Sequence, residues 1–312
     1  MKKGIANRVA APCLLALLVL ASGSALRAQG PPRPPVFGTG IEVINLNVSV
    51  TDARGRYITD LTKNDFAVFE DGVRQELSIF NHEDIPISLV LMIDTSASMD
   101  EKLPTARAAA IRFVGTLRPQ DNAQVMQFND RTTILQDFVA DHDALDSAIG
   151  RTEAAGPTAL HNALYVALKE LEKQKTQALR RRAIVLLSDG EDTASLVSDD
   201  QVLDLARKTE INIYAISLRP RRMQDRNAVK FSQAAHLLTA LTQDTGGQVH
   251  FPNSLSELDA VYDRIAEELH SQYSLGYVSS NPARDGRWRH ISVATPARSL
   301  QLRYRLGYFA PK

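Results

Sequence analysis

The middle of the chain alternates between short apolar runs and longer segments in which apolar residues recur every three or four positions. Residues 87–93 and 183–187 are almost continuously apolar. Residues 123–128 and 211–218 are also mainly apolar but include more polar positions. A strand covered on both faces has this composition. The helix-period segments are residues 105–117, 144–152, 158–173, 201–208, 228–242 and 255–269. This alternation predicts an α/β fold: a Rossmann-like, doubly wound, mostly parallel sheet with helices on both faces, and an added edge strand at 131–138.

Two regions with the alternating pattern of short strands flank this module, at residues 41–85 and 271–312. In the first region, the even-numbered positions of 44–50 are apolar, and Asp71-Gly72 predicts a hairpin. Alone, a region of roughly 45 residues buries too little surface to be stable. We therefore expect the two regions to pair into one small β-sandwich, with the α/β domain of residues 86–270 inserted into it. Two separate sheet extensions packed on the core are the alternative.

The first 28 residues have the pattern of a secretory signal peptide. Lys2, Lys3 and Arg8 precede an apolar run of about 13 residues, which is shorter than the roughly 20 that a bilayer-spanning helix requires. We expect cleavage after Ala28, with Ala25 as the other candidate and an uncleaved anchor as the alternative. Residues 29–40 contain four prolines, which predicts a stiff, extended linker.

Composition and charge exclude several kinds of partner and several kinds of site. Lys plus Arg and Asp plus Glu both number 36, so nothing attracts the whole chain to nucleic acid or to an anionic membrane surface. Cys13 is the single cysteine, which excludes disulfide frameworks and thiolate zinc sites. Cleavage at Ala28 removes four basic residues and no acid, and leaves 32 basic against 36 acidic residues. We interpret Arg180, Arg181 and Arg182 as a charged turn before a buried strand, with a phosphate grip as the alternative.

Five oxygen-bearing side chains occupy positions at which a parallel sheet collects a ligand. Asp94, Ser96 and Ser98 follow the first buried strand, Thr158 stands at a loop-to-helix junction, and Asp189 ends another buried strand. In open α/β sheets, ligands bind outside the carboxyl ends of the strands. Three hydroxyls and two carboxylates suit a hard divalent cation. Mg²⁺ is the leading candidate, with Mn²⁺ or Ca²⁺ as alternatives.

In this order and at these separations, the five residues resemble the metal-ion-dependent adhesion site (MIDAS) of von Willebrand factor type A (VWA) domains. The resemblance covers about residues 86–270. The segment 61–72 and the ending at 275–309 are similar to the flanks of an exported bacterial group, the acidobacterial VWA-related proteins. With these flanks, the resemblance extends over nearly all of the mature chain.

The resemblance implies a division of labour among the five residues. Ser96 and Ser98 would bind the ion directly, Thr158 would do so in the ligand-competent state, and Asp94 and Asp189 would act mainly through water. Neutral hydroxyls leave the positive charge of the ion under-compensated toward its open position. A carboxylate from a partner protein can then complete the coordination.

We therefore expect an exported, non-enzymatic, adhesion-type binding protein, periplasmic or extracellular, without a membrane span after signal cleavage. The chain has no Gly-x-Ser-x-Gly elbow, no His-Glu-x-x-His pair and no phosphate-cradling glycine loop. The alternatives are an envelope metal-dependent hydrolase that uses Asp94 and Asp189, and an envelope scaffold with a purely structural metal. We also expect the site to lie at a rim, so that Ser96→Ala or Asp94→Ala leaves the fold intact.

Overall fold

The structure is a computed structural model of the chain, and it describes residues 43–82, 85–174, 180–189, 192–218, 228–295 and 299–312, with side chains omitted for 228–234. The chain divides into two compact units, Met1–Gly40 and Ile41–Lys312, and all that follows concerns the second. The predicted signal peptide, its cleavage site and the 29–40 linker lie outside the described residues. Within the described ranges, no helix is both long enough and apolar enough to cross a membrane.

Six strands form the central sheet, in the order β10-β9-β8-β5-β6-β7. They are β5 (Ile87–Asp94), β6 (Asn122–Phe128), β7 (Thr132–Val139), β8 (Arg181–Ser188), β9 (Ile211–Ser217) and β10 (Val249–His250). Every neighbouring pair is parallel except β6 and β7. All residues of β5 and β8 are buried, which explains their nearly continuous apolar sequences. The predicted α/β class and the added edge strand are confirmed.

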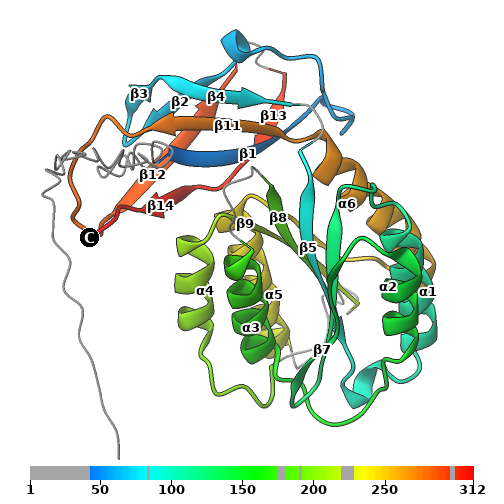
Figure 1. Cartoon of the computed structure of the whole chain (residues 1–312). Helices are drawn as coiled ribbons and strands as arrows, with labels where there is room; N and C mark the ends of the chain where they lie inside the picture. Colours follow the sequence, from blue (N-terminus) through cyan, green and yellow to red (C-terminus); the bar gives the residue numbers. More distant parts are fainter. Residues whose placement is uncertain (1–42, 83–84, 175–179, 190–191, 219–227, 296–298) are drawn as a thin grey trace, which may run out of the picture. The chain divides into compact units, whose positions relative to one another are not determined.

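Six helices cover the two faces of this sheet. They are α1 (Leu103–Val114), α2 (His142–Gly150), α3 (Leu160–Lys173), α4 (Asp199–Lys208), α5 (Ala228–Thr245) and α6 (Leu258–Ser271). Helices α1, α2 and α6 pack on one face, where they share a core with Leu89 and Leu91 of β5. Helices α3, α4 and α5 pack on the other face, against Val90 and Met92. Figure 1 shows these two layers.

The flanking regions form two four-stranded antiparallel sheets, in the orders β13-β1-β11-β4 and β14-β12-β2-β3. The strands are β1 (Val43–Thr51), β2 (Ala67–Glu70), β3 (Val73–Gln75), β4 (Leu77–Asn81), β11 (Tyr273–Val278), β12 (Trp288–Ala294), β13 (Gln301–Arg303) and β14 (Gly307–Phe309). Strand β1 pairs with β11 from Val43–Val278 to Val48–Tyr273. Residues from both sheets share one apolar core. Each sheet mixes strands from the two ends of the chain, so the two regions build a single β-sandwich (Figure 1).

A buried glutamate connects the β-sandwich to the α/β part of the chain. Glu268 of α6 is 1% exposed. Its Oε1 accepts from the Ser49 hydroxyl at 2.8 Å and from the Tyr214 hydroxyl at 3.0 Å. Its Oε2 accepts from the Tyr57 hydroxyl at 3.0 Å and pairs with the Arg303 guanidinium. Four donors on four different segments therefore converge on one carboxylate.

Candidate metal centre

Asp94 is the last residue of β5, and both of its carboxylate oxygens are held. Oδ1 accepts from the backbone N–H of Ser96 at 2.8 Å, and Oδ2 accepts from the Ser188 hydroxyl at 2.5 Å. The residue is fully buried. Burial raises the pKa of the Asp94 carboxyl, while the hydrogen bonds from Ser188 and Ser96 act in the opposite direction. The carboxylate is therefore fixed in place at the carboxyl end of the sheet.

The two serines of the turn link to Asp189, which directly follows β8. The hydroxyls of Ser96 and Ser98 lie 3.1 Å apart. The Ser98 hydroxyl donates to Asp189 Oδ1 at 2.8 Å. The turn is shaped by a short 3₁₀ segment, Ala97–Met99, which begins directly after Ser96. Four of the five predicted residues are therefore brought together by side-chain and backbone hydrogen bonds.

Thr158 lies on a loop that is bonded to the same turn. The backbone N–H of Ala97 donates to the Gly156 carbonyl at 2.9 Å, and that of Ala155 donates to the Thr95 carbonyl at 2.8 Å. Gly156 has a φ of +73°, a conformation that glycine adopts without strain. Thr158 itself is 5% exposed. The structure thus places the fifth predicted residue on a segment that contacts the Asp94–Ser98 turn.

The expectation that the site lies at a rim is correct for one residue and wrong for the others. Ser98 is exposed, whereas Asp94, Ser96, Thr158 and Asp189 are between 0% and 5% exposed. Asp94 also accepts hydrogen bonds from the Ser96 backbone N–H and from the Ser188 hydroxyl. Its replacement by alanine leaves a buried donor on Ser188 without this acceptor, so Asp94→Ala is not expected to leave the fold unchanged.

Lys102, which no sequence motif indicated, also contacts the cluster. The Lys102 ammonium forms an ion pair with Asp189 Oδ2 and donates to the Ser98 carbonyl at 3.2 Å. Lys102 is 31% exposed at its side chain, and Asp189 is 4% exposed. The available signal was its position four residues after Ser98, which is one helical turn. Ser188 was also missed as the partner of Asp94, although it directly precedes Asp189.

The residues present fit a hard divalent cation. Among the described residues, the buried Asp94 carboxylate is bonded to neutral donors, and Lys102 is the charged partner of Asp189. Of the two buried carboxylates, only that of Asp189 has an ammonium as a partner among the described residues, which leaves negative charge for a further cation to neutralise. In the same described ranges, no three His, Cys, Asp or Glu side chains gather as a metal site. Any ion held here would depend on the three hydroxyls beside the two carboxylates.

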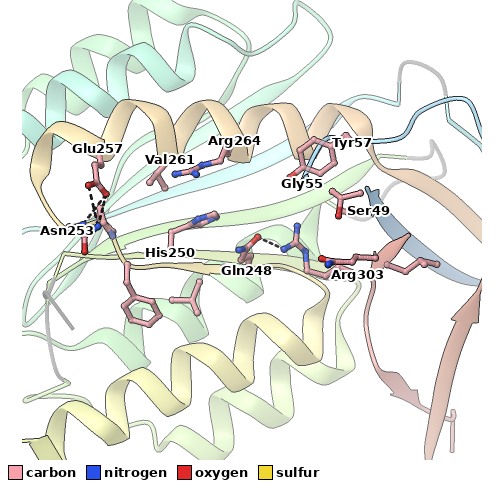
Figure 2. A pocket seen from close by; sticks show the side chains of 16 residues that line it. Ser49, Gly55, Tyr57, Gln248, His250, Asn253, Glu257, Val261, Arg264 and Arg303 are labelled. Carbon is pink, nitrogen blue, oxygen red and sulfur yellow. Dashed lines mark hydrogen bonds between the residues drawn. The ribbon is translucent and has the colours of Figure 1, made fainter. Parts of the chain in front are cut away.

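A separate pocket of about 820 Å³ lies between β10, α6, β1 and β13. Figure 2 shows His250 and Arg264 facing the same space and Arg303 bonded to Gln248. Burial, together with the charges of Arg264 and Arg303, lowers the pKa of His250 to about 4, so its imidazole is neutral at pH 7. None of the five predicted site residues lines this pocket, and it is distinct from the Asp94–Asp189 cluster.

Comparison with known proteins relates this part of the chain to a family. A sequence model described as the von Willebrand factor type A domain matches residues 89–191, a range that contains all five predicted residues. A UPF0353 protein of Nocardia farcinica is 26% identical over 223 residues, which cover 62% of this chain and 66% of that protein. The chain therefore spans slightly less than two thirds of this relative.

Two solved structures share the fold. A von Willebrand factor type A protein from Catenulispora acidiphila has a TM-score of 0.51 and 14% identity, covering 81% of this chain and 76% of that one. Proximal thread matrix protein 1 from the mussel byssus, whose MIDAS motif is occupied by zinc, also has a TM-score of 0.51, with 16% identity and coverage of 64% and 49%. The sheet order, the position of the cluster after β5 and β8, and the sequence match agree, and the chain carries a von Willebrand factor type A domain that includes residues 89–191.

Proposed function

We propose that this protein is an exported binding module that holds a divalent cation at the Asp94–Asp189 cluster and captures an acidic side chain of a partner protein. The observation that carries the proposal is the buried Asp94 carboxylate, held by neutral donors beside the hydrogen-bonded Ser96–Ser98–Asp189 chain. VWA domains typically mediate protein–protein binding, and the byssus protein holds zinc in its MIDAS motif. The predicted signal peptide of residues 1–28 supports export.

Each residue of the cluster has a distinct part in this proposal. Ser96, Ser98 and Thr158 would offer hydroxyl oxygens to the ion, and Asp94 and Asp189 would offset its charge. When bound, a divalent cation supplies a Lewis-acidic position that a carboxylate can fill. The chain's own contribution is to keep these groups in place: Ser188 fixes Asp94, and the bonded Gly156 loop fixes the segment of Thr158. Mg²⁺ is the ion that we propose.

Binding is better supported than hydrolysis. Within the described part of the chain, no histidine lies within hydrogen-bonding distance of the Ser96 or Ser98 hydroxyl, and Ser98 donates to a carboxylate that is already paired with Lys102. A nucleophilic serine requires a positioned base, and the Asp189 carboxylate is engaged with an ammonium. The non-enzymatic role is therefore the one that we propose.

The test is capture of envelope proteins on the immobilised mature chain in buffer with Mg²⁺, followed by elution with a chelator. We expect chelator to release the partner, and Mg²⁺ or Mn²⁺ to restore capture. Modification of the partner's carboxyl groups should prevent capture. Binding that survives chelation would remove the ion from the mechanism, and turnover of ester or phosphoester substrates that requires Asp189 would favour the hydrolase alternative.

Lys102 should weaken the affinity of this cluster for a divalent ion, because its ammonium already neutralises Asp189. We expect Lys102→Met to tighten Mg²⁺ or Mn²⁺ binding by about threefold to tenfold, the range that corresponds to the roughly 1 kcal/mol of a partly exposed ion pair. Lys169→Met is the matched control, since Lys169 pairs with Glu172 on the surface of α3. Titration calorimetry on the three proteins gives the affinities; equal values for Lys102→Met and the wild type would contradict this role.

A further inference from the structure

A small cavity of about 40 Å³ lies at the opposite end of the central sheet from the Asp94–Asp189 cluster. Its lining comes from the amino-terminal ends of β8 and β9 and from strands of the β-sandwich. Arg182 and Glu210 contribute from the α/β side, and Asn45 and Arg305 contribute from the sandwich side. The sequence interpretation of Arg180–Arg182 as a charged turn is therefore wrong for Arg181 and Arg182, which belong to β8 and are 3% and 7% exposed.

The buried charges around this cavity do not balance. Arg182 has one acidic partner, Glu210, at 3.2 Å. Arg305 is 9% exposed, and its Nε donates to the Gly307 carbonyl at 3.0 Å while the guanidinium lies over the Tyr308 ring. Its two terminal nitrogens have no hydrogen bond among the described residues. Two guanidinium groups thus line the cavity beside one carboxylate, and Arg305 forms no ion pair among the described residues, which is costly for a charge at a largely buried position.

Arg180 adds to the imbalance, whereas Arg181 is compensated at its terminal nitrogens but not at its buried Nε. Arg180 donates to the Ser88 hydroxyl and to the carbonyls of Ile87 and Gln120, all of which are neutral groups. Arg181 donates to the carbonyls of Leu269 and Gln272 at the carboxyl end of α6, where the helix dipole carries partial negative charge. The cavity is therefore lined by more positive than negative charge even when Arg181 is set aside.

The walls of the cavity are already fixed. Asn47 of β1 donates to the Asn212 side chain at 2.8 Å, and Asn212 donates to the Thr245 carbonyl at 2.9 Å. The Ser274 hydroxyl donates to Asn47 Oδ1 at 3.2 Å. Of these bonds, the one between Asn47 and Asn212 crosses from the sandwich to the α/β part, and none of them occupies the two terminal guanidinium nitrogens of Arg305. A ligand would therefore find a preorganised site, which lowers the entropic cost of binding.

We propose that this cavity binds a small tetrahedral oxyanion, of the inorganic phosphate or sulfate class, between Arg182 and Arg305. A volume of about 40 Å³ holds roughly three water molecules, which excludes a nucleotide or a peptide. Guanidinium groups match oxyanions in charge and in the geometry of their donors. Water could fill the same volume, but it would not neutralise the excess positive charge. The anion would connect the β8 strand to the segment between β13 and β14.

The test titrates sodium phosphate and sodium sulfate into the mature protein in EDTA, with chloride at matched ionic strength as the reference. EDTA removes divalent ions, so the result is independent of the proposed metal centre. We expect one anion per chain by calorimetry, and a melting temperature that rises with the logarithm of anion concentration and gains about 5 °C at 100 times the dissociation constant. Absence of a saturable heat in the wild type with both anions would overturn the proposal.

Two variants locate the binding. Arg305→Met and Arg182→Met should each lower anion affinity at least tenfold, whereas Arg264→Met, which replaces an exposed arginine of α6, should leave it unchanged. Because Arg305 has no acidic partner to lose, Arg305→Met is expected to fold with unchanged or increased stability in chloride. Anion binding of wild-type strength in both Arg305→Met and Arg182→Met would place the anion elsewhere and overturn the proposal.

Discussion

Ser98→Ala should lower the affinity for Mg²⁺ or Mn²⁺ by at least about 10- to 100-fold, the range found when groups that support a metal site are removed. Ser98 is the right residue for this test because it is exposed, and its hydroxyl stands between Ser96 and Asp189. Its loss deletes one oxygen donor and leaves the buried anchor of Asp94 by Ser188 untouched. We expect the melting temperature of the metal-free protein to stay close to that of the wild type.

The chain offers a matched control for this variant. Ser254 and Ser256 form another pair of hydroxyls two positions apart, 2.7 Å from one another, and both residues are exposed. Ser256→Ala removes the same group from the same kind of local pair, away from the cluster. It should bind the ion with wild-type affinity. Titration calorimetry that finds equal affinities for Ser98→Ala, Ser256→Ala and the wild type would contradict the role given to Ser98.

Glu268→Ala should destabilise the protein by about 3–5 kcal/mol, the cost of breaking a buried ion pair by removing one partner. The substitution leaves the Arg303 guanidinium without its carboxylate and removes the acceptor of the Ser49, Tyr57 and Tyr214 hydroxyls. These donors come from both the sandwich and the α/β part, so the joint between them should weaken first. The free energy of unfolding in urea measures the effect.

Glu267→Ala is the control for this prediction. Glu267 precedes Glu268 on the same helix and is exposed, so its replacement should change stability by less than about 0.5 kcal/mol. Glu268→Gln, which keeps an acceptor but loses the charge, should fall between the two. A Glu268→Ala protein as stable as Glu267→Ala would show that this network does not hold the two parts together.

The sequence predicted the central sheet because β5 and β8 are buried on both faces and their apolar residues are contiguous. The pairing of the flanking regions followed from their small size, and the observed β1–β11 pairing agrees with it. Helix starts were less accurate: α4 begins at Asp199 rather than at residue 201, because Ser198 caps it. A cap lies before the first apolar residue, so the apolar period alone placed the start of α4 too late.

The sequence predicted that the oxygen-bearing residues of the candidate site lie together, but it did not predict the positive charge of Lys102 beside Asp189. Asp94, Ser96, Ser98 and Asp189 are joined in space because two strands end at the same edge of a parallel sheet, which the apolar runs already indicate. The Lys102–Asp189 pair depends on the side-chain conformation of a residue at the start of a helix. Arg182 and Arg305 line the same cavity because the sandwich packs against the amino-terminal end of the central sheet. No local sequence pattern predicts this packing.

The central claim is that the Asp94–Asp189 cluster holds a divalent cation. Titration calorimetry of the purified mature protein with Mg²⁺, Mn²⁺ and Ca²⁺, after exhaustive chelation, tests it most directly. We expect saturable binding of one ion per chain that Ser98→Ala weakens and Lys102→Met strengthens. Wild-type protein that takes up none of the three ions, while remaining folded by circular dichroism, would contradict it.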